Sequence, residues 1–539
     1  MIGEIILKKG IAVLCAVVLL LSLCSCGKGK NINDAPIENK VEKSYSSDEL
    51  FSTSPKAAQY PLTENGETLT LGMTIMATEE DAPYTNRALE QSVAITGVNI
   101  EIIASSGSSG MDMMGVSGDY PDLIWQPASY LLEYEGEDVL ILNELMAEYA
   151  PNYLAALAND EDAQKSVLSD TGAALQFYTL NESPELRLSF GPVIRKDMLD
   201  GVGMKIPETY DELYEVLTAI KTQYSPELPL RLYPTGATGA DWLSAGYGVS
   251  VGSSAPDFGF YVVDGVVKYG PMEDGFESYV TMLNKWYSEG LITDAILDVL
   301  DISDSSYLMD QAIGKSAVFF AQYAGIETCE AMSEIDGFEL APIPDPVLTA
   351  GDTTHLAERR VELVYSEAYA VSAACEHPEL AVQWLDFWYS DEGRMLMNYG
   401  IEGESYEIDD EGNPRYLNPI NDAGRYSNVT LWNMSGVLSA HRLGLTYREG
   451  YEDVNAVWTS GKDTAYMLPT NLMMETSMAE DLTMMLRDLN SAADEGVMKF
   501  IVGDSPLSEL ETFRQKLNDM GAQRCIEYYQ VFYDNYMNR

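Results

Sequence analysis

The pattern of hydrophobic and polar residues predicts a chain that alternates between strands and helices. From residue 69 to residue 75, leucine, methionine and isoleucine alternate with polar or small residues, which is typical of a half-buried strand. Residues 85–96 predict a helix, residues 98–104 a second strand, and residues 118–125 a turn that leads into a short buried strand. Strands and helices in this order open an α/β sheet layer.

Helix signals recur further along the chain. Residues 209–212, Thr-Tyr-Asp-Glu, have the form of a capping box. In this motif the threonine hydroxyl accepts the backbone N–H of the glutamate, and the glutamate carboxylate accepts the backbone N–H of the threonine. Apolar residues then recur every three or four positions over residues 213–220, which predicts an amphipathic helix. Pro378 is placed to open another helix, and Ser505 is placed to cap a helix that has Pro506 at its first position.

The N-terminus carries the features of a secretory signal. Two lysines precede an uncharged apolar run over residues 11–23, which is shorter than the roughly 20 residues that span a bilayer. Residues 21–27, Leu-Ser-Leu-Cys-Ser-Cys-Gly, resemble a bacterial lipobox, which implies that residues 1–25 are removed and that Cys26 carries a diacylglycerol. Cleavage before Cys24, a plain signal peptide and a signal anchor are the alternatives.

Charge and composition limit the classes of function. Residues 26–60 are rich in Lys, Asn, Ser, Glu and Pro, which predicts a flexible, lipidated tether. The formal net charge is −53, and so acidic a surface repels nucleic acid and anionic lipid, which excludes nucleic-acid binding. A hydrophobic content of 46% is that of a globular chain, and no stretch after the signal is long and apolar enough to span a membrane.

Cysteine and histidine show no pattern that indicates a metal site or a nucleophile. Cys329, Cys375 and Cys525 follow the lipobox, and their odd number and wide spacing predict free, buried thiols. The three histidines lack the spacing of zinc ligands, and none stands beside a Gly-x-Ser-x-Gly motif. The sequence therefore predicts no cofactor, no catalytic residue and no metal site, and leaves open whether a structural calcium ion is bound.

Four segments of the body, together with the lipobox, resemble one protein family. Residues 193–214 contain Val-Ile-Arg-Lys-Asp-Met-Leu-Asp and Ile-Pro-Glu-Thr-Tyr-Asp-Glu-Leu-Tyr, which are similar to the RKDWLDKLG…PxTYDEL segment of family 1 extracellular solute-binding proteins, with Met198 in place of the usual tryptophan. Three further segments are similar to other patterns of the family: residues 279–292 to LNKLYKEGLID, residues 399–406 to YGIEGxSY, and residues 500–508 to FIxGxxPLSEWD. The chain is most similar to the large lipoprotein branch of carbohydrate ABC-importer receptors in Gram-positive bacteria.

The resemblance implies an α/β type II periplasmic-binding-protein fold, in which two discontinuous lobes face a hinged cleft. We assign residues 61–190 and 350–428 to lobe 1 and residues 191–349 and 429–539 to lobe 2. The chain is expected to cross between the lobes near Phe190, near residues 346–361 and near residues 426–431.

The resemblance also implies a function. The expected protein is a monomeric, lipid-anchored receptor on the outer face of the cell membrane, which captures an oligosaccharide or other carbohydrate and delivers it to an ABC permease without catalysis. One alternative is a secreted polysaccharide-cleaving lipoprotein enzyme, which needs two carboxylates about 5–10 Å apart. Another alternative is a binding protein for a peptide or other small solute.

A sugar-binding site needs flat apolar faces, which aromatic rings supply, and planar polar groups such as carboxylates. Trp125 ends a buried strand, where sheet-end loops meet a cleft, and Trp432 follows the third crossing. Trp242 lies where a glycine-rich loop turns into a helix, so its indole is expected to face the cleft, with Asp241 beside it. Core packing is the alternative for each tryptophan, and helix capping is the alternative for Asp241.

Four further candidates complete the predicted site. Tyr323 and Tyr365 each end an apolar strand that leads toward the cleft. Glu404 lies in the hairpin that resembles the family, and Asp81 lies in the loop after the first strand. Solvated surface is the alternative for the carboxylates, because the chain has 85 acidic residues. Helix positions predict core packing for three other tryptophans, Trp286, Trp384 and Trp388.

Overall fold

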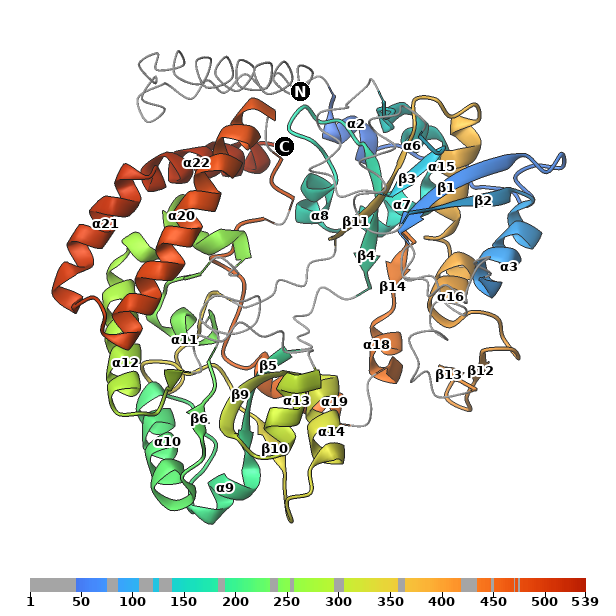
Figure 1. Ribbon diagram of the computed structural model, residues 1–539. Coiled ribbons are helices and arrows are strands. Elements are labelled where there is room, and N and C mark those ends of the chain that lie inside the picture. The colour runs from blue at the N-terminus through green and yellow to red at the C-terminus, as the bar shows by residue number, and fades with distance from the viewer. Residues whose placement is uncertain are drawn as a thin grey trace, which may run out of the picture. The chain divides into compact units, whose positions relative to one another are not determined.

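The structure, a computed structural model, describes most of the chain (Figure 1). The described residues are 45–74, 86–105, 120–125, 138–182, 190–232, 241–252, 256–294, 305–356, 364–417, 434–446, 450–469, 471–473 and 476–539. The predicted signal peptide, Cys26 and the tether as far as residue 44 lie outside them. None of the described helices is both long enough and apolar enough to cross a membrane.

Order begins earlier than the sequence predicts. The helix α2 (Ser47–Phe51) lies within the predicted tether, and its Leu50 is only 3% exposed because it packs into the hydrophobic core. Tyr45 donates its backbone N–H to the Thr171 carbonyl at 3.1 Å. The prediction of a flexible tether is therefore wrong for residues 45–60, because Leu50 is part of the core, Phe51 and Tyr60 pack against it, and Lys56 pairs with Glu148 at 2.7 Å.

A six-stranded sheet, the first sheet, organises one part of the described chain. Its strand order is β14-β4-β11-β3-β1-β2. The strands are β1 (Thr68–Thr74), β2 (Asn99–Ser105), β3 (Leu123–Trp125), β4 (Gln176–Asn181), β11 (Val364–Val371) and β14 (Val437–Leu438). Because β11 is antiparallel to both of its neighbours, and β1 is parallel to β2 and β3 while β14 is parallel to β4, five strands run one way and β11 runs the other.

The residues that form this layer follow the predicted pattern. Leu69 and Leu71 of β1 are buried, and Asn86 caps the following helix by accepting the Leu89 amide at 2.9 Å. The helices around the sheet are α3 (Arg87–Thr96), α6 (Asn143–Tyr149), α7 (Pro151–Leu157), α8 (Glu161–Ser166), α15 (Pro378–Phe387) and α16 (Asp391–Tyr399). Trp384 and Trp388 are fully buried in the core, as predicted.

A four-stranded sheet, the second sheet, organises another part. Its order is β10-β5-β9-β6, with β5 antiparallel to β9 and β10, and β6 parallel to β9. The strands are β5 (Phe190–Arg195), β6 (Leu228–Leu230), β9 (Ser316–Gln322) and β10 (Leu340–Pro342). The helices near it are α9 (Lys196–Gly201), α10 (Tyr210–Tyr224), α12 (Asp274–Ser288), α13 (Ser305–Ala312), α14 (Tyr323–Met332) and α19 (Tyr451–Trp458).

The capping box predicted for α10 is confirmed. The Thr209 hydroxyl accepts the Glu212 amide at 3.2 Å, and the Glu212 carboxylate accepts the Thr209 amide at 3.0 Å. The predicted cap at Ser505 is wrong. Pro506 instead precedes a 3₁₀ turn, Leu507–Glu509, that no side chain caps, and α21 (Leu510–Asp519) begins after it.

The remaining described elements are two hairpins, short helices and 3₁₀ turns, and the long C-terminal helices (Figure 1). They are α11 (Asp241–Ser244), the 3₁₀ turns η3 (Ala245–Tyr247), η4 (Pro256–Gly259) and η5 (Gly270–Met272), β7 (Phe260–Val263), β8 (Val266–Tyr269), β12 (Tyr406–Ile408), β13 (Pro414–Tyr416), α18 (Ala440–Thr446), α20 (Thr476–Val502) and α22 (Ala522–Met537). The pair β12 and β13 is the hairpin that the sequence predicts after residue 399.

The chain passes between the two sheets at three places. The first passage lies between β4 and β5, and the second lies between β10 and β11. The third passage separates β14, in the first sheet, from α19, which packs against β5 and β10. It therefore follows Leu438, later than the crossing predicted near residues 426–431, because a two-residue strand carries too little pattern to be seen in the sequence.

Candidate functional site

The carboxyl edge of the first sheet collects several of the predicted site residues. Five strands end at this edge, and ligands of open α/β sheets bind outside the carboxyl ends of the strands. Trp125 is the last residue of β3 and pairs with Tyr369 of β11. Because β11 runs the opposite way, it begins at the same edge, and Tyr365 is its second residue. The side chain of Tyr365 lies outside the described part of the structure.

Trp125 combines a packed ring with an unused donor. Its ring is partly buried and packs against the core of the first sheet. Its indole N–H is buried and has no hydrogen-bond acceptor among the described residues. A partly exposed indole at a sheet edge offers the apolar face that a sugar ring stacks on.

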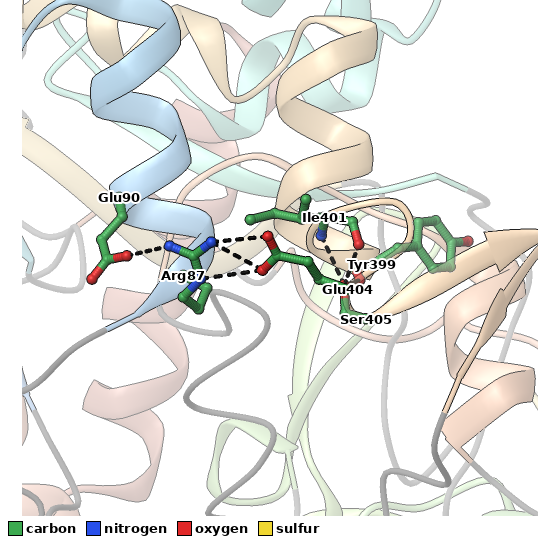
Figure 2. Close-up of polar contacts among 6 residues, drawn as sticks. All are labelled: Arg87, Glu90, Tyr399, Ile401, Glu404 and Ser405. Atoms are coloured by element: carbon green, nitrogen blue, oxygen red, sulfur yellow. Dashed lines mark hydrogen bonds and ion pairs between the residues drawn. The ribbon is translucent and has the colours of Figure 1, made fainter.

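Glu404 lies in an ion pair that the sequence does not reveal. Arg87, the first residue of α3, donates from Nη2 to both Glu404 carboxylate oxygens at 3.0 and 2.9 Å, and from Nε to Oε2 at 3.2 Å. The same guanidinium also bonds Glu90 at 2.5 Å, as Figure 2 shows. The hydrogen bonds that Arg87 donates to Glu90 and Glu404 raise the pKa of Arg87 above its usual value.

This charged group is accessible to a ligand. The side chains of Arg87 and Glu404 are each 53% exposed. Because α3 ends just before β2 begins at the opposite edge, its first residue, Arg87, lies toward the carboxyl edge of the first sheet. Guanidinium and carboxylate are the planar polar groups that bind hydroxyls, so Arg87 joins the candidate residues. The sequence does not reveal Arg87 as a candidate, because its partner Glu404 is 317 positions away.

The turn that carries Glu404 is fixed by a local network (Figure 2). The Ser405 hydroxyl accepts the Ile401 amide at 2.8 Å and donates to the carbonyls of Tyr399 at 2.7 Å and Ile401 at 3.0 Å. Beyond it, the Tyr416 hydroxyl donates to the Asn398 carbonyl at 2.7 Å. These bonds hold the β12–β13 hairpin against the end of α16, so the position of Glu404 is set by backbone contacts as well as by Arg87.

The candidates near the second sheet are more buried than the sequence predicts. Trp242 is only 1% exposed, so its expected exposure to a cleft is wrong: the turn that carries it packs against α12, and Leu243 and Ala245 beside it are buried too. Tyr323 follows β9 as the first residue of α14, is 5% exposed, and packs edge-to-face on Tyr451 with ring centroids 5.3 Å apart. The side chain of Asp241, and all of Asp81 and Trp432, lie outside the described residues.

No group in the described part of the chain is arranged for metal binding, and the thiols are inert. Three or more His, Cys, Asp or Glu side chains nowhere converge there to hold a metal ion. Cys329, Cys375 and Cys525 are free and buried, as predicted. Burial raises the pKa of each thiol to about 12, so they stay protonated at neutral pH and are poor nucleophiles.

Comparison with known proteins identifies the class of protein. Residues 82–395, more than half of the chain, match the family model described as bacterial extracellular solute-binding protein. The chain therefore belongs to this family, whose members bind a solute outside the cell and are not catalytic. This confirms the family that the sequence motifs indicate and rules out the polysaccharide-cleaving enzyme that was the alternative.

Individual relatives are distant. Lipoprotein LipO of Bacillus subtilis (strain 168) is 23% identical over 48% of this chain, and the matched region spans about half, 52%, of that relative. The fructooligosaccharide ABC transporter substrate-binding protein FusA of Streptococcus pneumoniae serotype 4 is 20% identical over 78% of this chain and 81% of FusA.

Solved structures confirm the fold. An extracellular solute-binding protein from Bifidobacterium longum subsp. infantis aligns over 88% of this chain and 99% of its own, with a TM-score of 0.71 at 18% identity. The alginate-binding protein AlgQ2 aligns over 88% and 99%, with a TM-score of 0.65 at 19% identity. At these identities the likeness shows the α/β solute-binding-protein fold, as the sequence predicts, and nothing about the ligand.

Proposed function

We propose that this solute-binding protein is the receptor of an ABC importer and that its solute is an oligosaccharide or another carbohydrate. The observation that carries the proposal is the carboxyl edge of the first sheet, where the Trp125 ring and the exposed Arg87–Glu404 pair offer an apolar face and planar polar groups. Relatives named for fructooligosaccharide and alginate binding support the same class of solute.

The proposed receptor has two lobes, built on the first and the second sheet. Lobe 1 keeps residues 61–190 and 350–428, extended by residues 45–60 and by β14, and lobe 2 holds residues 191–349 and the chain beyond α18. A solute that touches both lobes stabilises their closure, because it binds the closed state better than the open one. Micromolar affinity, about −8 kcal/mol, is enough for capture.

Trp125, Tyr365, Glu404 and Arg87 are the proposed ligand residues on lobe 1. On lobe 2, Tyr323 is the candidate whose side chain the structure describes. Asp81, Asp241 and Trp432 remain candidates, and their side chains lie outside the described part of the structure. Trp242 is not among them, because its indole is part of the core.

Trp125→Ala is expected to weaken oligosaccharide binding about 10- to 100-fold, because the variant loses the ring face that covers the apolar side of a sugar. Isothermal titration with a panel of neutral oligosaccharides measures the dissociation constant. The matched control is Tyr224→Ala, which removes an aromatic ring that is 41% exposed at the end of α10. Unchanged affinity in Trp125→Ala would contradict the site, and binding of peptides in place of every sugar would contradict the solute class.

We also propose that Cys26 is lipidated and holds the protein on the outer face of the membrane. The lipobox over residues 21–27 and the distant relative named a lipoprotein support this anchor. Cys26→Ala is expected to move the protein from the membrane fraction to the culture medium, because two acyl chains provide stable anchoring. Fractionation and immunoblotting measure the distribution. Equal retention of both proteins at the membrane would contradict the anchor.

A further inference from the structure

A pocket lies between α10 and α12, apart from the candidate edge. It is open, has a volume of about 460 Å³, and has Tyr247 of η3 among its walls. The described candidates Trp125, Tyr323 and Glu404 are not among its walls. Its volume is within the range of about 300–1,000 Å³ that binds small organic ligands.

Aromatic rings form the apolar part of the pocket and are held in place. Tyr247 is half-buried and packs obliquely on the buried Tyr210, with ring centroids 4.6 Å apart. Tyr214 lies near-parallel to the buried Trp286 at 6.4 Å, and its hydroxyl donates to Glu289 at 2.8 Å. The ring faces are therefore pre-organised, which lowers the entropic cost of stacking a ligand on them.

The polar part of the pocket contains both acceptors and donors. Asp211, Asp274 and Glu277 are exposed carboxylates along its walls. The Lys285 ammonium lies 3.9 Å from the centroid of the Tyr214 ring. Burial and the charge of Asp211 raise the pKa of Tyr247 to about 12, so its hydroxyl keeps its proton and can donate at neutral pH.

This combination favours a polyhydroxylated ligand over a simple ion. The three carboxylates outnumber the one ammonium, so the pocket repels an anion and attracts a cation by charge alone, but a simple inorganic cation leaves Lys285 and the ring face of Tyr247 without a partner in the ligand. A sugar hydroxyl both donates and accepts, and a pyranose presents C–H bonds to an aromatic face. The walls offer partners for all of these groups.

We propose that the α10–α12 pocket is a second carbohydrate-binding site, which takes one or two rings of a neutral oligosaccharide. The sugar ring stacks on Tyr247, the carboxylates of Asp211 and Glu277 accept its hydroxyls, and Lys285 donates to it. The inference rests on the proposed function, because the same class of solute fills both sites. It adds a place where an oligosaccharide binds outside the edge that carries Trp125.

The test is a titration of the mature chain, with Cys26→Ala to keep it free of lipid. Maltotriose and kestose are the neutral probes, trigalacturonate is the anionic probe, and cadaverine is the amine probe. We expect two neutral trisaccharides per chain, at least a tenfold loss at one site in Tyr247→Leu, and loss at the other site in Trp125→Ala. Tyr224→Leu, the same change outside the pocket on α10, is expected to keep both sites.

The outcomes separate the two proposals. A stoichiometry of one that Trp125→Ala abolishes and Tyr247→Leu leaves unchanged overturns the second site and keeps the proposed function. One site that only Tyr247→Leu weakens keeps the pocket and overturns the assignment of Trp125. Binding of cadaverine or trigalacturonate in the pocket, or of no neutral probe at all, overturns the second site. If Tyr247→Leu fails to fold, Glu277→Gln replaces it, since this exposed position changes charge with little change of shape.

Discussion

Lys462→Ala is expected to lower the free energy of unfolding by about 3–5 kcal/mol, a large part of the stability of an ordinary domain. The Lys462 ammonium pairs with the Asp345 carboxylate, and the two side chains are 1% and 2% exposed. Alanine at position 462 removes the Lys462 counter-charge from a carboxylate that stays buried. Chemical denaturation followed by circular dichroism measures the change.

The matched control is Lys205→Ala, which removes an exposed lysine just after α9. This change is expected to alter the free energy of unfolding by less than about 0.5 kcal/mol. The double variant Lys462→Met with Asp345→Leu is expected to recover most of the loss, because it removes both charges and keeps the volume. A loss below about 1 kcal/mol in Lys462→Ala would show that the pair is not buried in solution.

The Lys462–Asp345 pair joins two segments of the chain that lie next to the passages between the sheets. Asp345 lies just after β10, on the segment that leads from the second sheet to β11. The same segment pairs with the chain around Lys462, where the Thr354 amide donates to the Gly461 carbonyl at 2.8 Å and the Asp463 amide donates to the Thr354 carbonyl at 2.8 Å. The ion pair and these backbone bonds join the second passage between the sheets to the chain that follows the third passage.

Local patterns explain which parts of the fold the sequence predicts. The alternation that starts at residue 69 and the capping box at Thr209 act within a few positions, and the strand, as far as the described Thr74, and the capping box are confirmed. The tryptophans on amphipathic helices, Trp286 and Trp384, are buried for the same reason. In these cases the period of the apolar residues determines which side of an element faces the core.

Contacts between distant residues explain what the sequence does not predict. Glu404 meets Arg87 across 317 positions, and Lys462 meets Asp345 across 117, in a chain with 85 acidic residues and no local sign of which ones pair. Trp242 is buried because α12 packs over its turn, which depends on how two separate elements meet. The candidate site is thus predictable as a sheet edge that carries Trp125, while its charged partners require the structure.

Trp458→Ala is expected to destabilise the protein by about 3–5 kcal/mol, through the cavity left by the largest side chain. The sequence pattern gives no position for Trp458, but in the structure it is fully buried against the start of β5. Its indole N–H donates to the Pro192 carbonyl at 3.0 Å. The ring lies so close to Gly191 that a Cβ there would be 2.4 Å from it.

Two further variants separate packing from hydrogen bonding at Trp458. Trp458→Phe keeps most of the ring and removes the indole donor from the Pro192 carbonyl, which still accepts the Ile343 amide at 3.0 Å, so a smaller loss of about 0.5–1.5 kcal/mol is expected. Gly191→Ala keeps the indole but forces it to move, with an expected loss of about 1–3 kcal/mol. Equal losses in the Phe and Ala variants would show that the hydrogen bond, and not the filled volume, stabilises this contact. Because β5 pairs with β9, and β9 leads directly into Tyr323, either loss is also expected to loosen the strand that positions this candidate ligand residue.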